Sequence, residues 1–301
     1  MGECRNCSST EVKDLGFVGA VEPFFLKRVY NMEIGVPVSR NRIKRLLGGV
    51  LGPVKRWVEK LQPSAALVEL QICLTCSFVQ MKEILPEEWI NRMYSDYRSD
   101  SYNNERTRYE PSYAAIAEKI GLPQEAPIRV AGLTKWLAGK MDIAGDFTML
   151  DFGGADGRFL PDMPARKYVF EISDYPPATG ITRIESAQEL GKYSYVQLAH
   201  VLEHVMHPLQ MVQSVSERVE PGGFLYVEVP QDDTDATLAD LRRGEISKNL
   251  PIHEHVNRYS APAVTRMLEQ AGLDVAAIET ERCDFGYATW TIVRGLGRKK
   301  K

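Results

Sequence analysis

Short apolar runs alternate with helix-forming segments in the second half of the chain. Four runs have the length and the abrupt polar ends of strands buried in a parallel sheet. They end at Leu150, Phe170, Leu198 and Val229. Between the last two, apolar residues recur at helical spacing, at Leu209, Val212, Val215 and Val219. This alternation predicts an α/β fold with a Rossmann-like, doubly wound sheet.

Helix boundaries can be placed from proline, glycine and serine positions. Pro221-Gly222-Gly223 predicts the end of the helix between the last two strands. Ser260 predicts the N-cap of a further helix that ends near Gly272. Ahead of the first strand, Pro111–Gly139 predicts two helices. These helices would form a connector between an N-terminal unit and the sheet.

Residues 40–60 carry an apolar stripe opposite a basic face. The stripe comprises Ile43, Leu46, Leu47, Val50, Leu51, Val54, Trp57 and Val58, and the basic face comprises Arg40, Arg42, Lys44, Arg45, Lys55, Arg56 and Lys60. Gly48-Gly49 and Gly52-Pro53 argue against one long rigid helix. Three interpretations stay open: packing on this protein or on a second subunit, peripheral membrane contact, and a polynucleotide footprint. The oligomeric state stays open with them.

Length and charge limit the class of protein. The chain has 301 residues, 44% of them hydrophobic, and a net charge of −3. At roughly 150 residues per domain, this length predicts two domains. The charge predicts no general affinity for nucleic acid. The first residues lack the apolar core of a signal peptide, and no run approaches the roughly 20 apolar residues of a membrane span, so we expect a cytoplasmic protein.

Four of the five cysteines form two Cys-x-x-Cys pairs. The pairs are Cys4 with Cys7 and Cys73 with Cys76. In a reducing compartment, paired motifs of this kind indicate a metal site more often than disulfides. Four thiolates close a tetrahedral zinc site and leave no open position, so we predict a structural zinc. Reduced or redox-active dithiols are the alternative.

A glycine-dense turn, Asp151-Phe-Gly-Gly-Ala-Asp-Gly157, follows the first predicted strand. Gly153, Gly154 and Gly157 allow positive φ angles and a close approach of backbone to a ligand. Ala155 interrupts the glycines and predicts an ordinary φ at its position. The turn predicts a cradle for a small molecule at the carboxyl end of the strand.

All five histidines lie between residues 200 and 255. His253-Glu254-His255 is the densest group, in a polar stretch after the last predicted strand of the four. Histidine is the side chain best suited to moving protons near neutral pH. We therefore expect this stretch to carry catalysis, and a solvated loop is the alternative.

The glycine turn resembles the first motif of class I S-adenosylmethionine-dependent methyltransferases, acid-x-Gly-x-Gly-x-Gly. The stretch His200–Val205, Pro221-Gly222-Gly223 and the strand after it follow in that family's order, so the resemblance covers about residues 145–295. It implies that S-adenosylmethionine is the cofactor. The cofactor-binding residues that the resemblance implies are Asp151, Gly153, Gly154, Ala155, Gly157, Glu171, Ser186, Ala187 and His200. Glu171 would bind the ribose hydroxyls, and Ser186 and Ala187 would lie near the adenine.

A cysteine unit ahead of this fold resembles the sugar C-methyltransferases. That family carries Tyr-x-Glu-His where this chain has Ile252, Glu254 and His255. The resemblance implies that His255 is the general base, with Glu254 and His204 beside it. It also implies that a tyrosine between Trp89 and Tyr113 reaches the site. The implied acceptor is a nucleotide-linked sugar or a related glycan precursor.

The sequence thus predicts an enzyme in three parts. They are a zinc-binding domain at 1–95 with the basic insert, a helical connector at 96–143 and the S-adenosylmethionine-binding domain at 144–301. Ile252 lacks the hydroxyl of the family's tyrosine, so O-methylation of another metabolite or a lipid-linked glycan competes with C-methylation. A non-catalytic S-adenosylmethionine-binding scaffold is a further alternative, because Ala155, Ser186 and Ile252 depart from the family pattern.

Overall fold

The computed structural model describes residues 2–32, 66–94, 96–97, 99–117, 119, 125–142, 145–173, 175–284 and 289–301. The basic insert at 40–60, with its predicted helical stripe and membrane contact, lies outside these ranges. In the part of the chain so described, no helix is long and apolar enough to cross a bilayer.

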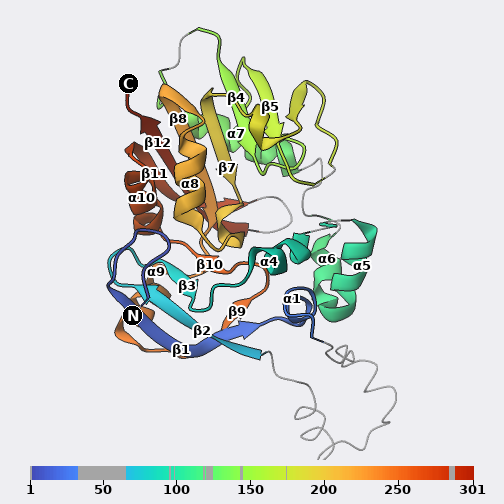
Figure 1. The fold of residues 1–301 in the computed structure, drawn as a ribbon, viewed down its shortest axis with the longest axis vertical. Helices are drawn as coiled ribbons and strands as arrows, with labels where there is room; N and C mark the ends of the chain where they lie inside the picture. Colours follow the sequence, from blue (N-terminus) through green and yellow to red (C-terminus); the bar gives the residue numbers. More distant parts are fainter. Residues whose placement is uncertain are drawn as a thin grey trace, which may run out of the picture.

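A seven-stranded sheet forms the upper half of the molecule (Figure 1). Its strand order is β11-β12-β8-β7-β4-β5-β6. The strands are β4 (Thr148–Phe152), β5 (Arg166–Phe170), β6 (Ile181–Ile184), β7 (Tyr193–Ala199), β8 (Val219–Pro230), β11 (Leu273–Asp284) and β12 (Thr289–Lys299). Strands β4 to β8 pair in parallel, whereas β12 is antiparallel to β8 and to β11. The predicted α/β, Rossmann-like architecture is confirmed.

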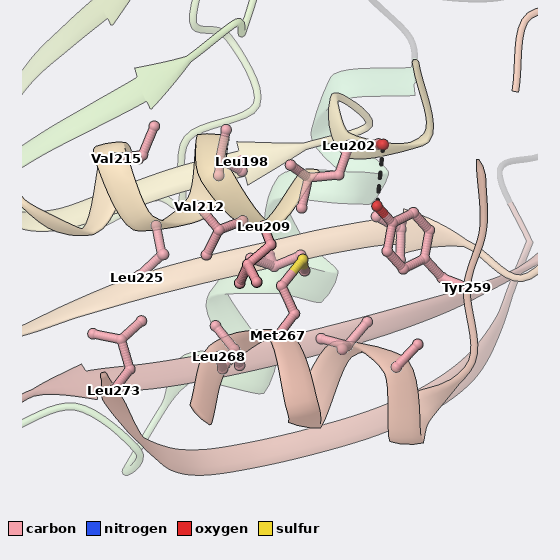
Figure 2. Close-up of a cluster of buried hydrophobic side chains, with 14 of the residues drawn as sticks. Leu198, Leu202, Leu209, Val212, Val215, Leu225, Tyr259, Met267, Leu268 and Leu273 are labelled. Carbon is pink, nitrogen blue, oxygen red and sulfur yellow. Dashed lines mark hydrogen bonds between the residues drawn. The ribbon is translucent and has the colours of Figure 1, made fainter. Parts of the chain in front are cut away.

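Helices cover both faces of this sheet because alternate strand residues point to opposite sides. Helices α8 (Pro208–Ser216) and α10 (Ala261–Gln270) pack one face through the side chains in Figure 2, including Val212 and Met267. Helix α7 (Glu125–Leu137) covers the other face and packs Trp136 against Tyr226. Helix α9 (Asp235–Arg243) follows β8.

Two predicted helix boundaries have different outcomes. Ser260 is the N-cap of α10, and its side chain accepts a hydrogen bond from the backbone N–H of Ala263, as predicted. The prediction that Pro221-Gly222-Gly223 ends the preceding helix is wrong. Helix α8 ends at Ser216, and the three residues lie inside β8. Gly223 pairs closely there, because a Cβ on it would lie 2.7 Å from the backbone oxygen of Ser194.

A five-stranded sheet forms the lower half, in the order β10-β3-β2-β1-β9. Strands β1 (Val12–Val21), β2 (Ala66–Cys73) and β3 (Val79–Met81) come from the N-terminal part. Strands β9 (Leu250–Ile252) and β10 (Asn257–Arg258) come from the opposite end of the chain. The N-terminal sheet is therefore not made by residues 1–95 alone, and the three-part division stays a prediction.

Short helices lie beside the lower sheet. They are α1 (Pro23–Arg28), α4 (Glu87–Tyr94), α5 (Asp100–Tyr109), the 3-10 turn η1 (Pro111–Tyr113) and α6 (Ala114–Ala117). Pairing of β9 with β1 and of β10 with β3 fixes both ends of residues 253–256. The predicted catalytic stretch is therefore a short loop held at each end by the N-terminal sheet.

Candidate functional site

The glycine turn after β4 has the backbone geometry of a cradle. Gly153 and Gly157 have φ angles of 74° and 78°. A Cβ on Gly154 would lie 2.0 Å from the carboxyl carbon of Asp151, so only glycine fits there. The prediction of an ordinary φ at Ala155 is wrong, because this residue has a φ of 53°. A non-glycine residue in this region costs about 1–2 kcal/mol.

Glu171, at the carboxyl end of β5, stabilises that strained turn. Its Oε2 accepts a hydrogen bond from the backbone N–H of Ala155 over 3.0 Å. Its Oε1 accepts another from the N–H of Ser173 over 2.9 Å. The carboxylate thus lies beside the turn, where the predicted ribose contact requires it.

Ser186 and Ala187 follow β6 at the same edge of the sheet. Ser186 precedes the 3-10 turn η2 (Ala187–Glu189), and its hydroxyl donates to Glu189 Oε1 over 3.0 Å. Because β4, β5 and β6 are parallel, their carboxyl ends meet at one edge. The structure therefore brings these two residues to the same edge as Glu171 and the glycine turn.

Asp151 is a buried carboxyl at the base of the turn. Gln197 Nε2 donates to its Oδ1 over 3.3 Å, and its Oδ2 has no hydrogen-bond partner among the described residues. Burial raises the pKa of Asp151 to about 7, against the lowering effect of Gln197. The group is therefore half protonated near neutral pH and would gain from a cationic partner.

Arg129 on α7 is a residue that the sequence analysis missed. Its guanidinium contacts Glu228 Oε1 at 3.0 Å and Glu125 Oε1 at 3.2 Å, and it lies 4.2 Å from the ring centre of Phe159. Arg129, Phe159 and Glu228 line a small cavity together with Gln197, the residue that donates to Asp151. An arginine within the apolar run Ile128–Leu133 of the helix that precedes the first strand was the available signal.

His200, predicted to line the cofactor pocket, lies between two carboxylates. Its Nδ1 is 3.3 Å from Glu203 Oε1, and its Nε2 is 3.2 Å from Glu228 Oε1. Burial and the charge of Arg129 lower the pKa of His200, but its contacts with the carboxylates of Glu203 and Glu228 outweigh them and raise it. Its φ of 55° turns the chain sharply after β7.

The predicted catalytic residues come together from distant parts of the chain. His204 lies in the 3-10 turn η3 (Leu202–His204), and its ring centre is 5.1 Å from that of His255. The hydroxyl of Tyr94 lies 2.8 Å from His204 Nδ1, so Tyr94 is the tyrosine of the Trp89–Tyr113 segment that reaches this site. His204 Nδ1 is also 3.1 Å from the backbone oxygen of Glu254.

Charged partners give the two imidazoles different proton affinities. Burial lowers the pKa of His204. Burial also lowers the pKa of His255, but the charge of Asp232, whose Oδ2 lies 3.0 Å from His255 Nδ1, raises it to about 9. Such opposed environments are typical of acid and base groups in enzymes.

Glu254 is an ionised carboxylate beside the histidines. Arg106 on α5 donates to Glu254 Oε1 over 2.9 Å, and Glu254 Oε2 has no hydrogen-bond partner in the described part of the chain. Burial raises the pKa of Glu254, but Arg106 and the nearby histidines lower it to about 2. The roles of Arg106 and Asp232 were not predictable from the sequence, because charge alone does not say which distant residue a side chain meets.

Ile252 lies in β9 and is 1% exposed. It pairs with Val21 of β1 and belongs to the apolar core of the lower sheet. A hydroxyl-bearing side chain at this position would enter that core. The packing of this core therefore accounts for an apolar residue where the family has tyrosine.

The four paired cysteines converge on one buried point. Cys4 Sγ is 3.8 Å from Cys76 Sγ, and Cys7 Sγ is 3.7 Å from Cys73 Sγ. Zinc–sulfur bonds of about 2.3 Å in a tetrahedron would place the sulfurs about 3.8 Å apart. None of the four forms a disulfide. The donor set and its dimensions thus fit a closed tetrahedral metal site.

Comparisons with known proteins agree with the fold. A family model described as "Methyltransferase domain" matches residues 104–278, more than half of the chain. No curated protein matches the sequence significantly.

Solved structures give similarity at low identity. The chain is similar to magnesium protoporphyrin IX methyltransferase from Synechocystis PCC 6803, with 13% identity over 66% of this chain and 98% of that chain and a TM-score of 0.42. It is also similar to 1,6-didemethyltoxoflavin-N1-methyltransferase from Burkholderia thailandensis, with 14% identity over 76% of this chain and 98% of that chain and a TM-score of 0.43. That second structure contains S-adenosylhomocysteine and 1,6-didemethyltoxoflavin.

Proposed function

This chain belongs to the methyltransferase domain family, and we propose that it methylates a nucleotide-linked sugar or a related glycan precursor. Membership makes it an S-adenosylmethionine-dependent methyltransferase. The acceptor and the residues that perform the reaction are the proposal. The observation that carries it is the convergence of His204, Glu254 and His255 on one site.

Residues at the carboxyl edge of the large sheet would hold S-adenosylmethionine. The turn Asp151–Gly157 would take the methionine end, and Glu171 would accept hydrogen bonds from the ribose hydroxyls. Asp151 would pair with the ammonium group, since its Oδ2 has no other partner among the described residues. Arg129 would pair with the carboxylate. His200 would line this pocket, and Ser186 and Ala187 would lie near the adenine.

His255 would act as the general base. S-adenosylmethionine carries its methyl group on a sulfonium, so the reaction needs alignment of the nucleophile and removal of one proton. The acceptor's proton would pass to the ring nitrogen of His255 that Asp232 does not contact. The acceptor atom would then attack the methyl carbon as the carbon–sulfur bond breaks. His204 and Glu254 would orient the acceptor.

The acceptor atom is either carbon or oxygen. Removal of a proton beside a ketone would give an enolate for C-methylation, whereas removal from a hydroxyl would give O-methylation. Both acceptor atoms stay open, because the buried Ile252 stands where the resembling family has a tyrosine and lacks the hydroxyl that accompanies C-methylation there. A lipid-linked glycan is the acceptor that membrane contact through residues 40–60 would favour.

Zinc would serve structure in this protein. The buried set Cys4, Cys7, Cys73 and Cys76 supports it. A reducing cytoplasm, where we place the protein, would keep these thiols available for metal. The ion would have no open coordination position, so we assign it to folding of the N-terminal sheet.

A methyl-transfer screen tests the acceptor. Purified protein and S-adenosylmethionine are incubated with nucleotide-linked sugars and with matched free sugars, and products are read by mass. A gain of one methyl group on a nucleotide-linked sugar, and not on the free sugar, supports the proposal. Transfer only to other hydroxylated metabolites would replace the sugar class with the O-methyl alternative.

A further inference from the structure

Three side chains next to the acceptor site have the arrangement of metal ligands. They are Glu203, His204 and His255. Glu203 offers a carboxylate oxygen and each histidine offers one ring nitrogen, and these three atoms all lie within 4.8 Å of one another. Glu203 Oε1 lies 3.8 Å from His204 Nε2. This group is separate from the four cysteines and contains no thiolate.

Glu203 is a buried carboxylate, which independently supports a cation site. It is 1% exposed, and neither of its oxygens has a hydrogen-bond partner among the residues that the structure describes. Its near neighbours are the imidazoles of His204 and His200, the latter at 3.3 Å. A buried carboxylate without hydrogen bonds is costly unless it meets a cation. Its Oε1 lies against the imidazole of His200, whereas its Oε2 has no hydrogen-bond partner among the described residues and is left for a further cation.

Each imidazole is oriented through its Nδ1. His255 Nδ1 lies 3.0 Å from Asp232 Oδ2, and His204 Nδ1 lies 3.1 Å from the backbone oxygen of Glu254. A carboxylate or a carbonyl behind a histidine is the usual support for a metal-binding imidazole. His204 Nε2 lies toward Glu203, and the ring nitrogen of His255 that Asp232 does not contact is left for a ligand.

Backbone contacts hold the two ligand-bearing segments together. The N–H of Val256 donates to the backbone oxygen of Glu203 over 2.9 Å. Asn257 Nδ2 donates to the backbone oxygens of Leu202 and Val205. A site whose supporting residues are fixed binds its ligand with little reorganisation.

We propose that Glu203, His204 and His255 bind a divalent transition-metal ion such as Zn²⁺ or Fe²⁺. Two histidines and one carboxylate form a known three-ligand set for such ions and leave coordination positions open. Tetrahedral ligands at about 2.0–2.2 Å lie about 3.4 Å apart, so the three side chains close by about 1 Å on binding. His255 is half-buried, with 30% of its side chain exposed.

One consequence rests on the proposed function. A metal bound to His255 occupies the nitrogen that would take the acceptor's proton. Metal binding and general-base action by His255 therefore exclude each other, and the cation is an inhibitor of the enzyme.

Cobalt titration tests the site without any acceptor. Protein isolated with its cysteine-bound metal is titrated with Co²⁺, followed by visible absorption. We expect one further equivalent that shows d–d bands and no thiolate-to-cobalt charge transfer. Glu203→Gln and His255→Ala should each weaken this binding more than tenfold. Asp232→Asn, which removes only the support of His255, should weaken it about 10–100-fold.

Two controls locate the ion. His207→Ala removes an exposed histidine of the same segment and should leave cobalt binding unchanged. His253→Ala removes a histidine that forms a second set of possible metal ligands with Glu22 and Glu110. Loss of binding in His253→Ala, with retention in Glu203→Gln, would assign the ion to that group and overturn the proposal.

Chemical modification gives a second readout. Diethyl pyrocarbonate reacts with neutral imidazole, so it should modify His255 only slowly in metal-free protein because Asp232 raises the pKa of this residue, and Zn²⁺ should slow the modification more than tenfold further, with His207 modified equally in both. Absence of a further cobalt equivalent, or equal modification of His255 with and without Zn²⁺, would overturn the proposal. Neither result bears on methyl transfer, so failure of this inference is distinguishable from failure of the proposed function.

Discussion

The side-chain amide of Asn257 donates a hydrogen bond to the backbone carbonyl of Leu202 over 2.9 Å. The same nitrogen donates to the carbonyl of Val205 over 2.6 Å. Asn257 is fully buried and begins β10, directly after the loop that carries His255. It therefore ties the turn that carries His204 to the start of the strand that follows the His255 loop.

Substitution of Asn257 should cost both stability and turnover. Asn257→Ala removes the donor that the carbonyls of Leu202 and Val205 share, although the hydroxyl of Tyr259 still donates to that of Leu202, so we expect a loss of about 1–3 kcal/mol in the free energy of unfolding. Urea denaturation measures it, with the exposed Gln210→Ala as a control expected within about 0.5 kcal/mol of the parent. Equal stability of the two variants would show that these hydrogen bonds contribute nothing net.

Local signals in the sequence were enough for four parallel strands of the large sheet, β4, β5, β7 and β8, whereas β11 and β12 were not predicted. The apolar runs that end at Asp151 and Glu171 are strands because a parallel sheet buries both faces. Ser260 caps α10 because its hydroxyl reaches an N–H three residues on. Each of these features depends on residues close together in sequence.

Features that depend on distant residues were missed. Strands β9 and β10 have three and two residues, which is too short for a periodic pattern, and they exist because β1 and β3 pair with them. Ala155 takes a positive φ because Glu171, from the next strand, holds its N–H. The partners of His255 and Glu254 were likewise unpredictable, because Asp232 and Arg106 reach them only through the fold.

Binding of S-adenosylmethionine should depend on pH through Asp151. The pKa of this carboxyl is raised to about 7 because burial disfavours its charge. In the free protein the group therefore reduces stability as pH rises from about 4 to 7, since the unfolded chain loses the proton first. The ammonium of the cofactor would favour the ionised form, so affinity should rise about tenfold from pH 6 to pH 8.

Calorimetry at several pH values measures this dependence. Asp151→Asn should bind S-adenosylmethionine more weakly at pH 8 and should lose the dependence. A parent protein whose dissociation constant is constant from pH 6 to pH 8 would remove Asp151 from the ammonium contact.

Glu171→Ala should weaken S-adenosylmethionine binding by about 1.5–3 kcal/mol, the range for hydrogen bonds to a charged group. The variant also loses the acceptor for the N–H of Ala155, so the turn should relax as well. Glu171→Gln retains an acceptor oxygen for that N–H and isolates the charge. An unchanged dissociation constant in both variants would place the ribose contact elsewhere.

The cysteine cluster should carry zinc at one ion per chain. Elemental analysis of freshly purified protein measures it, and less than half an equivalent would contradict the prediction. Cys73→Ser should lower the unfolding temperature, because Cys73 ends β2 and the cluster packs on α10 through the hydrogen bond from Asn6 to Ala263. S-adenosylmethionine binding should be largely retained, because its predicted residues lie at the large sheet.

Replacement of the base should separate cofactor binding from chemistry. His255→Ala should bind S-adenosylmethionine normally and lose about 100-fold to 10,000-fold in turnover, the usual contribution of a positioned general base. Glu254→Gln should lose less, because its inferred task is to orient the acceptor. His207→Ala is the matched control and should behave as the parent.

The pH profile of turnover then tests the environment of His255. Asp232 raises the pKa of this imidazole to about 9, above the usual histidine value of about 6.5, and only the neutral form accepts a proton. Turnover, assayed without added divalent metal, should therefore rise with pH up to about 9. Asp232→Asn removes the negative charge, lowers the pKa of His255 and should move the midpoint of the rise to lower pH.

Incubation of a ketosugar acceptor in heavy water distinguishes the two chemistries, since exchange beside the ketone that requires His255 indicates an enolate and C-methylation. Methyl transfer without exchange indicates an oxygen acceptor, and full activity of His255→Ala would exclude this loop from the reaction.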